Sequence, residues 1–399
     1  MPGDSEAGAN AGQRPGEILV SPATYRHTRR IFEFAEIALQ EIAHENLGQM
    51  AENAIKLPVL YRLLRALPLP EKVRGIEGLQ AALIGRDEEI ILTSPQRPIV
   101  LLKKLEDCSL PDSVAPNNKY LGFMLPYSPH QYLLLRDNFD VLVMTSANLA
   151  EEPIASGKDE VLERLTGIPD LCVLHDREII QRCDDSIATV TGGYTHIIRR
   201  ARGFVPAPVF VGEKTSRNIL ACGGELKNTI ALSRGDQVFL SQHIGDLFNL
   251  ESLSFYSESI RHLQQVFEIS PEIVACDLHP DYLSTRYAEE LSLPLYRIQH
   301  HHAHAVAIMA EHGLTEPVLA VVMDGTGFGP DGTIWGGEFL RADLTSYSRL
   351  GYLSPLQLPG GDKAAVEPWR MALSTLYRLY GEEGTAVANL PPALVKIPN

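Results

Sequence analysis

The chain contains few cysteines: five among 399 residues. They are odd in number, widely separated and never arranged as C-x-x-C, which argues against a disulfide framework and against a structural zinc site built on cysteine. We predict reduced thiols buried in the core. The five are Cys108, Cys172, Cys183, Cys222 and Cys276.

Long apolar runs are also missing. No stretch approaches the roughly 18 apolar residues that a membrane-spanning helix needs. Residues 1–17 have neither the basic start nor the apolar centre of a secretory signal, and their Gly, Pro and polar composition predicts disorder. The sequence therefore predicts a cytoplasmic protein with no membrane partner.

Positive charge is scarce, because 35 Lys and Arg residues face 50 Asp and Glu residues and give a net charge of -15. This excess repels a phosphate backbone, so nucleic acid is not expected as a partner. The one dense basic cluster is "IIRRARGF" at residues 197–204. Two interpretations stay open for it: a solvated strand end, or a phosphate site that uses the fork of the arginine side chain.

The composition, with 45% hydrophobic and 21% charged residues, is typical of a globular protein long enough for two domains. Apolar residues at helical spacing predict helices within residues 29–47 and 58–67. Between residues 97 and 204, short apolar runs alternate with helix-like segments and predict an α/β domain. The Pro-rich, polar stretch 204–218 predicts a domain boundary.

Beyond that boundary, three short apolar runs between residues 218 and 242 predict a β-meander. An amphipathic helix at 251–268, a strand at 272–277, a helix at 282–291 and a strand leading to residue 299 then predict βαβ units. The second region is therefore expected to be α/β as well.

Four of the chain's 13 histidines lie in "QHHHAH", where this last strand gives way to a helix. His300 and His304 are spaced i to i+4, so both imidazoles project from one helix face about 6 Å apart and can chelate one metal ion. A strand end that opens into a helix is also where α/β folds bind ligands. A polar helix start is the alternative, but four histidines at one turn favour metal or anion binding. His301 and His302 point elsewhere on the helix and are expected to matter less, although either could donate a hydrogen bond to a ligand side chain.

Two glycine-bearing hairpins flank the histidines in the sequence. In "VVMDGTGFGPDGTIWGGEFL" an apolar strand leads to Asp324, which is placed to hold a cation, and the glycines that follow let the backbone approach a phosphate. "ACGGELKNTIALSRGD" has the same character, with Lys227 and Asn228 after a glycine pair. Plain tight turns are the alternative. Together with the histidines, the hairpins predict a nucleotide and metal site.

Taken in order, these segments resemble the hydrogenase-maturation carbamoyltransferases of the HypF type. The resemblance runs from about Ile90 to about Leu376 through "TSPQRPIVLLKK", "LVMTSANLAEEPI", "RRARGFVP", "GGELKNTIALSRGDQVFLSQHIGDL", "QHHHAHAVAIMAEHGL", "DGTGFGPDGTIWGGEFL" and "LPGGDKAAVEPWRMAL". It implies an α/β chain in which a partial YrdC-like domain at 89–210 precedes the first lobe of a Kae1-like, actin-type ATPase (ASKHA) domain at 216–399. Residues 18–88 are expected to form a helical segment of unknown relation.

The resemblance also implies an activity. Carbamoyl phosphate and ATP would give a carbamoyl-adenylate in the YrdC-like domain. The Kae1-like domain would pass the carbamoyl group to the C-terminal cysteine of a HypE-type partner, for the cyanide ligand of a NiFe hydrogenase. Adenylate formation needs cationic and N–H groups around phosphate, and transfer to a thiolate needs a polarised electrophile, which fits the residue types present.

By the same resemblance the site residues take roles. Divalent iron or zinc would bind His300, His304 and Asp324, and Mg²⁺ would accompany ATP. Asp324 and Lys227 would be catalytic. Nucleotide contacts would come from Gly223, Gly224, Glu225, Lys227, Asn228, Thr229, Gly325, Thr326, Gly327, Thr145, Ser146, Asn148 and Arg202, with Arg182, Asp185 and Ser186 as weaker matches.

Relative to this family the chain is expected to be truncated at both ends. The acylphosphatase-like domain, the C-x-x-C zinc modules, a basic phosphate segment of the YrdC-like domain and the second lobe of the ATPase are not found. Two alternatives therefore accompany the carbamoyltransferase hypothesis: O-carbamoylation of a small molecule, and a non-catalytic fragment that binds nucleotide or a partner.

Overall fold

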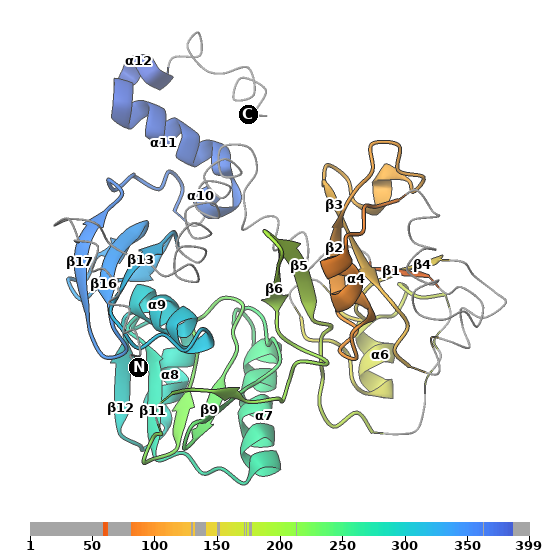
Figure 1. Ribbon diagram of the computed structural model, residues 1–399, viewed down its shortest axis with the longest axis horizontal. Helices are drawn as coiled ribbons and strands as arrows, with labels where there is room; N and C mark the ends of the chain where they lie inside the picture. The colour runs from red at the N-terminus through yellow and green to blue at the C-terminus, as the bar shows by residue number, and fades with distance from the viewer. Residues whose placement is uncertain are drawn as a thin grey trace, which may run out of the picture. The chain divides into compact units, whose positions relative to one another are not determined.

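The computed structural model describes residues 59–62, 81–128, 131, 141–149, 152–170, 172, 174, 178–212, 214–361 and 363–385 (Figure 1). All of them belong to one of the chain's two compact units, Ala54–Asn399. The predicted disorder of residues 1–17 and the predicted helix within 29–47 lie outside the described residues.

A mixed six-stranded sheet of order β4-β1-β3-β2-β5-β6 organises the first part of the chain. Its strands are β1 (Val59–Arg62), β2 (Ile99–Lys103), β3 (Tyr120–Met124), β4 (Val141–Met144), β5 (Ile187–Thr191) and β6 (Tyr194–Arg199). With it come the helices α4 (Arg86–Thr93), η1 (Asp112–Val114) and α6 (Lys158–Arg164). The β1/β3 and β2/β5 pairs are parallel and the others antiparallel. The α/β prediction for residues 97–204 is confirmed.

The helix predicted for residues 58–67 is wrong where the structure describes it. Residues 59–62 form β1, which pairs with β3 on one side and with β4 on the other. The ladder hydrogen bonds to these two neighbouring strands outweigh the local helical spacing. The sequence misleads here because a short apolar run fits a strand inside a sheet as well as it fits a helix.

A second six-stranded sheet, of order β12-β11-β8-β9-β10-β7, follows. Its strands are β7 (Val209–Phe210), β8 (Ile219–Ala221), β9 (Ala231–Arg234), β10 (Gln237–Leu240), β11 (Ile273–Asp277) and β12 (Leu295–Ile298), and its helices are α7 (Leu250–Phe267) and α8 (Leu283–Glu290). Strands β8, β9 and β10 form the predicted meander, and β8, β11 and β12 run parallel. The predicted βαβ order is confirmed. Strand β7 lies within the segment predicted as a boundary and pairs with β10.

Helix α7 packs on this sheet with one apolar face. Its first turn is capped by Asn249, whose side chain accepts a hydrogen bond from the Ser252 N–H at 2.8 Å. Phe255, Tyr256 and Ile260 are spaced to bury one face of the helix in the core that the sheet shares with α8. The buried Tyr256 hydroxyl donates to the Cys222 carbonyl at 3.0 Å, which ties the helix to the end of β8.

The rest of the described chain begins with α9 (His300–Glu311), which packs against β13 (Val318–Val322), β16 (Glu338–Ala342) and β14 (Gly327–Phe328). Strands β13, β16 and β17 (Tyr347–Tyr352) form an antiparallel sheet, and β14 pairs with β15 (Ile334–Trp335). The last helices are α10 (Lys363–Val366), α11 (Pro368–Tyr380) and α12 (Glu382–Thr385).

All five cysteines are free, and Cys222 and Cys276 are buried as predicted. The prediction of core thiols is wrong for Cys172 and Cys183, which are exposed, and Cys108 is half-buried. These three cysteines lie in neither a helix nor a strand, so no periodic pattern determines whether they are buried. Among the described helices, none combines the length and the hydropathy needed to cross a bilayer.

Candidate metal centre

The candidate centre lies where two parallel strands of the second sheet end. Asp277 is the last residue of β11, and β12 ends two residues before His300. Because β11 and β12 are parallel neighbours, their carboxyl ends reach the same sheet edge. Gln299 caps the helix that follows by accepting a hydrogen bond from the His302 N–H at 2.8 Å. The strand end and the cap together fix where the histidines of α9 begin.

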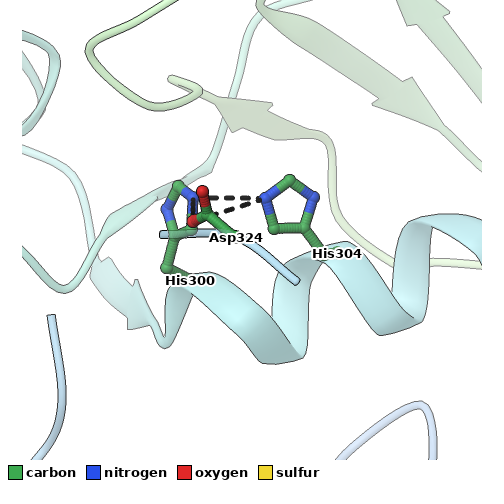
Figure 2. Close-up of side chains that lie close together, drawn as sticks. All are labelled: His300, His304 and Asp324. Carbon is green, nitrogen blue, oxygen red and sulfur yellow. Dashed lines mark hydrogen bonds and ion pairs between the residues drawn. The ribbon is translucent and has the colours of Figure 1, made fainter. Parts of the chain in front are cut away.

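His300 and His304 face one another one turn apart on α9 (Figure 2). Their Nε2 atoms are 3.2 Å apart. Asp324, which follows β13, places its carboxylate against the His300 ring, with Oδ2 3.0 Å from His300 Nε2 and 4.0 Å from His304 Nε2. One ligand atom from each of the three residues lies within 4.8 Å of the others. The structure thus brings together the three residues predicted as metal ligands.

Sequence reasoning missed Asp277. Its Oδ2 lies 2.6 Å from His300 Nδ1, so the carboxylate holds the ring with Nε2 turned towards Asp324. The signal was present, because Asp277 ends a strand parallel to the one that leads into the histidines, and acidic groups at such ends meet at one edge. A carboxylate on the far nitrogen of a histidine is the usual partner of a metal-binding imidazole.

The charges in the cluster shift its pKa values in opposite directions. The Asp277 and Asp324 carboxylates raise the pKa of His300 to about 10. Burial lowers the pKa of His301, and partial burial together with the nearby His300 lowers that of His304. Burial alone would raise the pKa of Asp324, but His300 and the other two rings outweigh it and lower it. Without a metal, His300 therefore carries the positive charge of the cluster.

The donor set fits a divalent cation. Two imidazoles and one carboxylate are typical ligands of zinc and iron, and the open side of such a site admits substrate. Among the described residues, the buried Asp324 Oδ2 has no hydrogen-bond partner of good geometry, which a cation would supply. A bound cation would take the place of the proton on His300 Nε2.

His302, expected to matter less, indeed turns away from the cluster, with Nε2 2.9 Å from the Asp343 carbonyl. His301 differs from the expectation. It is fully buried, and its Nε2 lies 4.0 Å from Asp324 Oδ2. The helix begins at His300, so the ring of His301 turns inward under the loop that carries Asp324.

The first glycine hairpin, Gly223–Thr229, joins β8 to β9 beside the cluster. A Cβ at Gly224 would lie 3.7 Å from His300 Cε1, which shows how closely the loop approaches. Asn228 is buried and donates to the carbonyls of Cys222 at 3.0 Å and Gly224 at 2.6 Å. Glu225 accepts from the Leu283 N–H at 2.8 Å at the start of α8. These two side chains shape the loop, and exposed Lys227 remains at its surface.

Gly223 needs its lack of a side chain for two reasons. Its φ is +70°, in the left-handed region, and a Cβ would overlap the Thr229 carbonyl oxygen and lie 2.8 Å from Asn228 Nδ2. Glycine is therefore required at this position of the hairpin.

The glycines of the second hairpin differ in the space around them. A Cβ at Gly327 would overlap His301 Cε1 and lie 3.0 Å from His300 Cβ, whereas a Cβ at Gly325 would meet nothing within 4 Å. Gly325 and exposed Thr326 thus leave backbone open beside Asp324, while Gly327 gives room to the histidines. Phosphate contact by Gly327, predicted from the sequence, stays a prediction.

This difference predicts the effect of adding one methyl group. Gly327→Ala should lower the free energy of unfolding by about 1–3 kcal/mol, because the new carbon displaces His301 or the loop. Gly325→Ala, two residues away, should change it by less than about 0.5 kcal/mol. Urea unfolding of the two variants measures this difference. Equal effects would contradict the close packing of Gly327 on His301.

His243, which lies near the first hairpin, predicts a pH dependence of the free energy of unfolding. Burial and the charges of Arg199 and Lys227 lower the pKa of His243 to about 3, below the value of about 6.5 in an unfolded chain. The unfolded chain therefore binds the extra proton first, so this residue costs no stability above pH 6.5 and destabilises the fold as the pH falls towards 3.

Relative to His243→Gln, the wild type should lose about 1.4 kcal/mol of unfolding free energy per pH unit below pH 6. Urea unfolding of both proteins at pH 7, 6 and 5 measures the difference, in which the other titrating groups cancel. A difference that stays constant with pH would contradict a partly buried, neutral His243.

The structure describes each residue near the first six-stranded sheet that was predicted to bind nucleotide. Thr145 and Ser146 are exposed after the edge strand β4, and Asn148 donates to the carbonyls of Leu149 and Glu152 at 2.8 and 3.0 Å. Ser186 is buried and bonds the backbone of residues 201 and 202. Its hydroxyl therefore joins two neighbouring backbone segments.

The arginines of this domain contact protein groups. Arg182 donates to the Ile154 carbonyl at 2.8 Å and pairs with Glu160 at 3.3 Å. Arg202 pairs with Asp185 at 2.6 Å, donates to the carbonyl groups of residues 96 and 97, and covers the Tyr127 ring at 3.4 Å. Nucleotide binding by either arginine stays a prediction.

Comparisons with known proteins identify this combination of domains. A family model described as the HypF Kae1-like domain matches residues 214–311, and one described as "Carbamoyltransferase, Kae1-like Domain, second subdomain" matches residues 320–394. The Sua5/YciO/YrdC model, described as "Telomere recombination", matches residues 62–201. The chain is thus an α/β protein with a YrdC-like part followed by a Kae1-like part.

Among curated proteins, carbamoyltransferase HypF2 of Cupriavidus necator is 47% identical over 323 residues, which cover 75% of this chain and 40% of the relative. HypF of Rhizobium leguminosarum is 46% identical over 352 residues, covering 86% of this chain and 46% of the relative. A crystal structure of full-length HypF in its phosphate- and nucleotide-bound form matches with a TM-score of 0.76 and 38% identity, covering 86% of this chain and 53% of that one.

The chain belongs to the HypF carbamoyltransferase family. It spans about half the length of the curated relatives it matches.

Proposed function

We propose that this chain takes part in ATP-dependent carbamoyl transfer, with the Kae1-like part as the transfer site. The observation that carries the proposal is the His300, His304 and Asp324 cluster, set beside two glycine hairpins in a chain of this family. Carbamoyl phosphate supplies the carbamoyl group, ATP activates it, and a thiolate accepts it. The acceptor we propose is the C-terminal cysteine of a HypE-type protein, which serves cyanide-ligand synthesis for NiFe hydrogenases.

The chemistry divides into two steps. Hydrolysis of carbamoyl phosphate by water gives carbamate and inorganic phosphate. A carbamate oxygen then attacks the α-phosphorus of ATP and expels pyrophosphate, which forms a carbamoyl-adenylate. The acceptor thiolate then attacks the carbamoyl carbon and expels AMP. We assign the first step to the YrdC-like part, with nucleotide contacts from Thr145, Ser146 and Asn148. The second step belongs to the Kae1-like part.

In the transfer step, each group of the Kae1-like part has a task. His300, His304 and Asp324 would hold a divalent metal, iron or zinc, which would supply a Lewis acid for the carbamoyl oxygen. The open backbone at Gly325, and that of Gly224 beside His300, would approach the phosphate of the adenylate. Lys227, exposed on the first hairpin, brings a positive charge to the leaving phosphate. Asp277 keeps the His300 ring turned towards the metal.

An assay for conversion of ATP to AMP, with and without carbamoyl phosphate, tests the proposal on the full chain. Pyrophosphate release that depends on carbamoyl phosphate supports the enzyme. ATP binding without turnover, measured in the same samples, would overturn catalysis by this chain and favour a fragment that only binds nucleotide. Radiolabelled carbamoyl phosphate offered with a HypE-type protein and with its variant lacking the terminal cysteine identifies the acceptor.

A further inference from the structure

His301 lies between the two proposed ligand histidines on α9, yet its surroundings differ from theirs. It is fully buried, whereas the His304 side chain is 54% exposed. The hairpin backbone at Gly327 packs on its ring so closely that a Cβ there would overlap it. A buried imidazole held in one place has a fixed role for each of its two nitrogens.

Gln299 determines which nitrogen of His301 carries the proton. The Gln299 Oε1 atom accepts from the His302 N–H at 2.8 Å, so the other end of the amide, Nε2, must be its NH₂ group. That Nε2 lies 3.0 Å from His301 Nδ1 and 3.4 Å from the Phe328 carbonyl. An amide NH₂ can only donate, so His301 Nδ1 accepts and the proton of the neutral ring is on Nε2.

The proton on Nε2 faces the carboxylate of Asp324. His301 Nε2 is 4.0 Å from Asp324 Oδ2 and is buried with no hydrogen-bond partner among the described residues, while Oδ2, 3.0 Å from His300 Nε2, makes no hydrogen bond of good geometry there. Buried polar atoms are nearly always paired, and a side-chain rotation that brings the two about 1 Å closer makes a hydrogen bond. The site therefore holds a donor and an acceptor that complement each other.

We propose that His301 is a positioning residue whose Nε2–H donates to Asp324 Oδ2 and keeps that carboxylate turned towards His300 and His304. A protonated Nε2 cannot bind a metal, so His301 acts through Asp324. The remaining lone pair of Oδ2 and the whole of Oδ1 stay available to the cation. This inference rests on the proposed metal centre for its purpose, but its two structural parts, the tautomer and the contact, are measurable without metal.

The first measurement is ¹⁵N NMR of the metal-free full chain labelled on histidine, with His301 identified by the signal that His301→Gln lacks. We expect a protonated, pyrrole-type Nε2 and an unprotonated, pyridine-type Nδ1. Gln299→Glu replaces the donor by an acceptor and should move the proton to Nδ1. Asp324→Asn should shift the resonance of the His301 Nε2 proton. A proton on Nδ1 in the wild type, or a proton resonance indifferent to Asp324→Asn, would overturn the inference.

The second measurement is the affinity for Zn²⁺ alone. His301→Phe should bind zinc about 10-fold to 100-fold more weakly, while His301→Gln, which keeps a donor near the position of Nε2, should recover most of the loss. His302→Ala removes a neighbouring imidazole that faces Asp343 and should leave the affinity unchanged. Equal zinc affinity of the wild type and His301→Phe would overturn the positioning role. A wild type that binds no metal overturns the proposed metal centre, and the NMR result then decides the His301 contact separately.

Discussion

Replacing both His300 and His304 by alanine should remove the bound metal from the purified chain and leave its fold intact. The two rings supply two of the three side chains whose ligand atoms converge within 4.8 Å. A site with so few protein ligands does not tolerate the loss of two. The fold should persist because these positions begin a helix and His304 is 54% exposed. Elemental analysis measures the metal, and circular dichroism measures the fold.

His302→Ala is the matched control, since it removes an imidazole from the same helix turn without touching the cluster. It should keep the metal content of the wild type. Equal metal content in the wild type and the double variant would contradict the metal centre and leave a polar helix start, as the alternative interpretation of the histidine run has it.

Arg349→Met should destabilise the fold by about 3–5 kcal/mol, because it leaves a buried carboxylate without its partner. Glu338 is fully buried and accepts a two-pronged ion pair from Arg349, with distances of 2.6 and 2.7 Å. Glu338 Oε1 also accepts from the Gly336 N–H at 3.1 Å, at the end of the Asp324 hairpin. The pair therefore stabilises the strand that supports the candidate centre.

Urea unfolding measures this effect, with Arg341→Met on the exposed side of the same sheet as the control. The double variant Glu338→Gln/Arg349→Met should be more stable than Arg349→Met alone, because the uncompensated charge is gone. If Arg349→Met costs no more than Arg341→Met, the ion pair has no such role.

The clustering of His300, His304 and Asp324 was predictable because its signals are local. The i to i+4 spacing of His300 and His304 sets their common face, and Asp324 follows an apolar strand whose end is a regular place for a ligand. Asp277 depended on a non-local fact, the parallel pairing of β11 with β12, which places a residue 23 positions earlier against His300. The inward turn of His301 depended on where α9 begins.

The same limit explains the glycines and the first sheet. Gly325 and Gly327 look alike in the sequence, and only the packing of His301 separates them. At residues 59–62 an apolar run fits a helix and a central strand equally well, and pairing with β3 and β4 decided the matter. In the part of the chain that forms the second sheet, by contrast, short strands and amphipathic helices have clearly different patterns, and the order of these elements along the chain was predicted correctly.

X-ray absorption spectroscopy of the metal-loaded full chain tests the central claim most directly. Two imidazole nitrogens and one carboxylate oxygen predict a first shell of nitrogen and oxygen at about 2.0–2.2 Å, with the multiple scattering typical of imidazole rings, lost in the His300→Ala/His304→Ala variant. A shell dominated by sulfur at about 2.3 Å, or a spectrum unchanged in the variant, would place the metal elsewhere and contradict the centre formed by His300, His304 and Asp324.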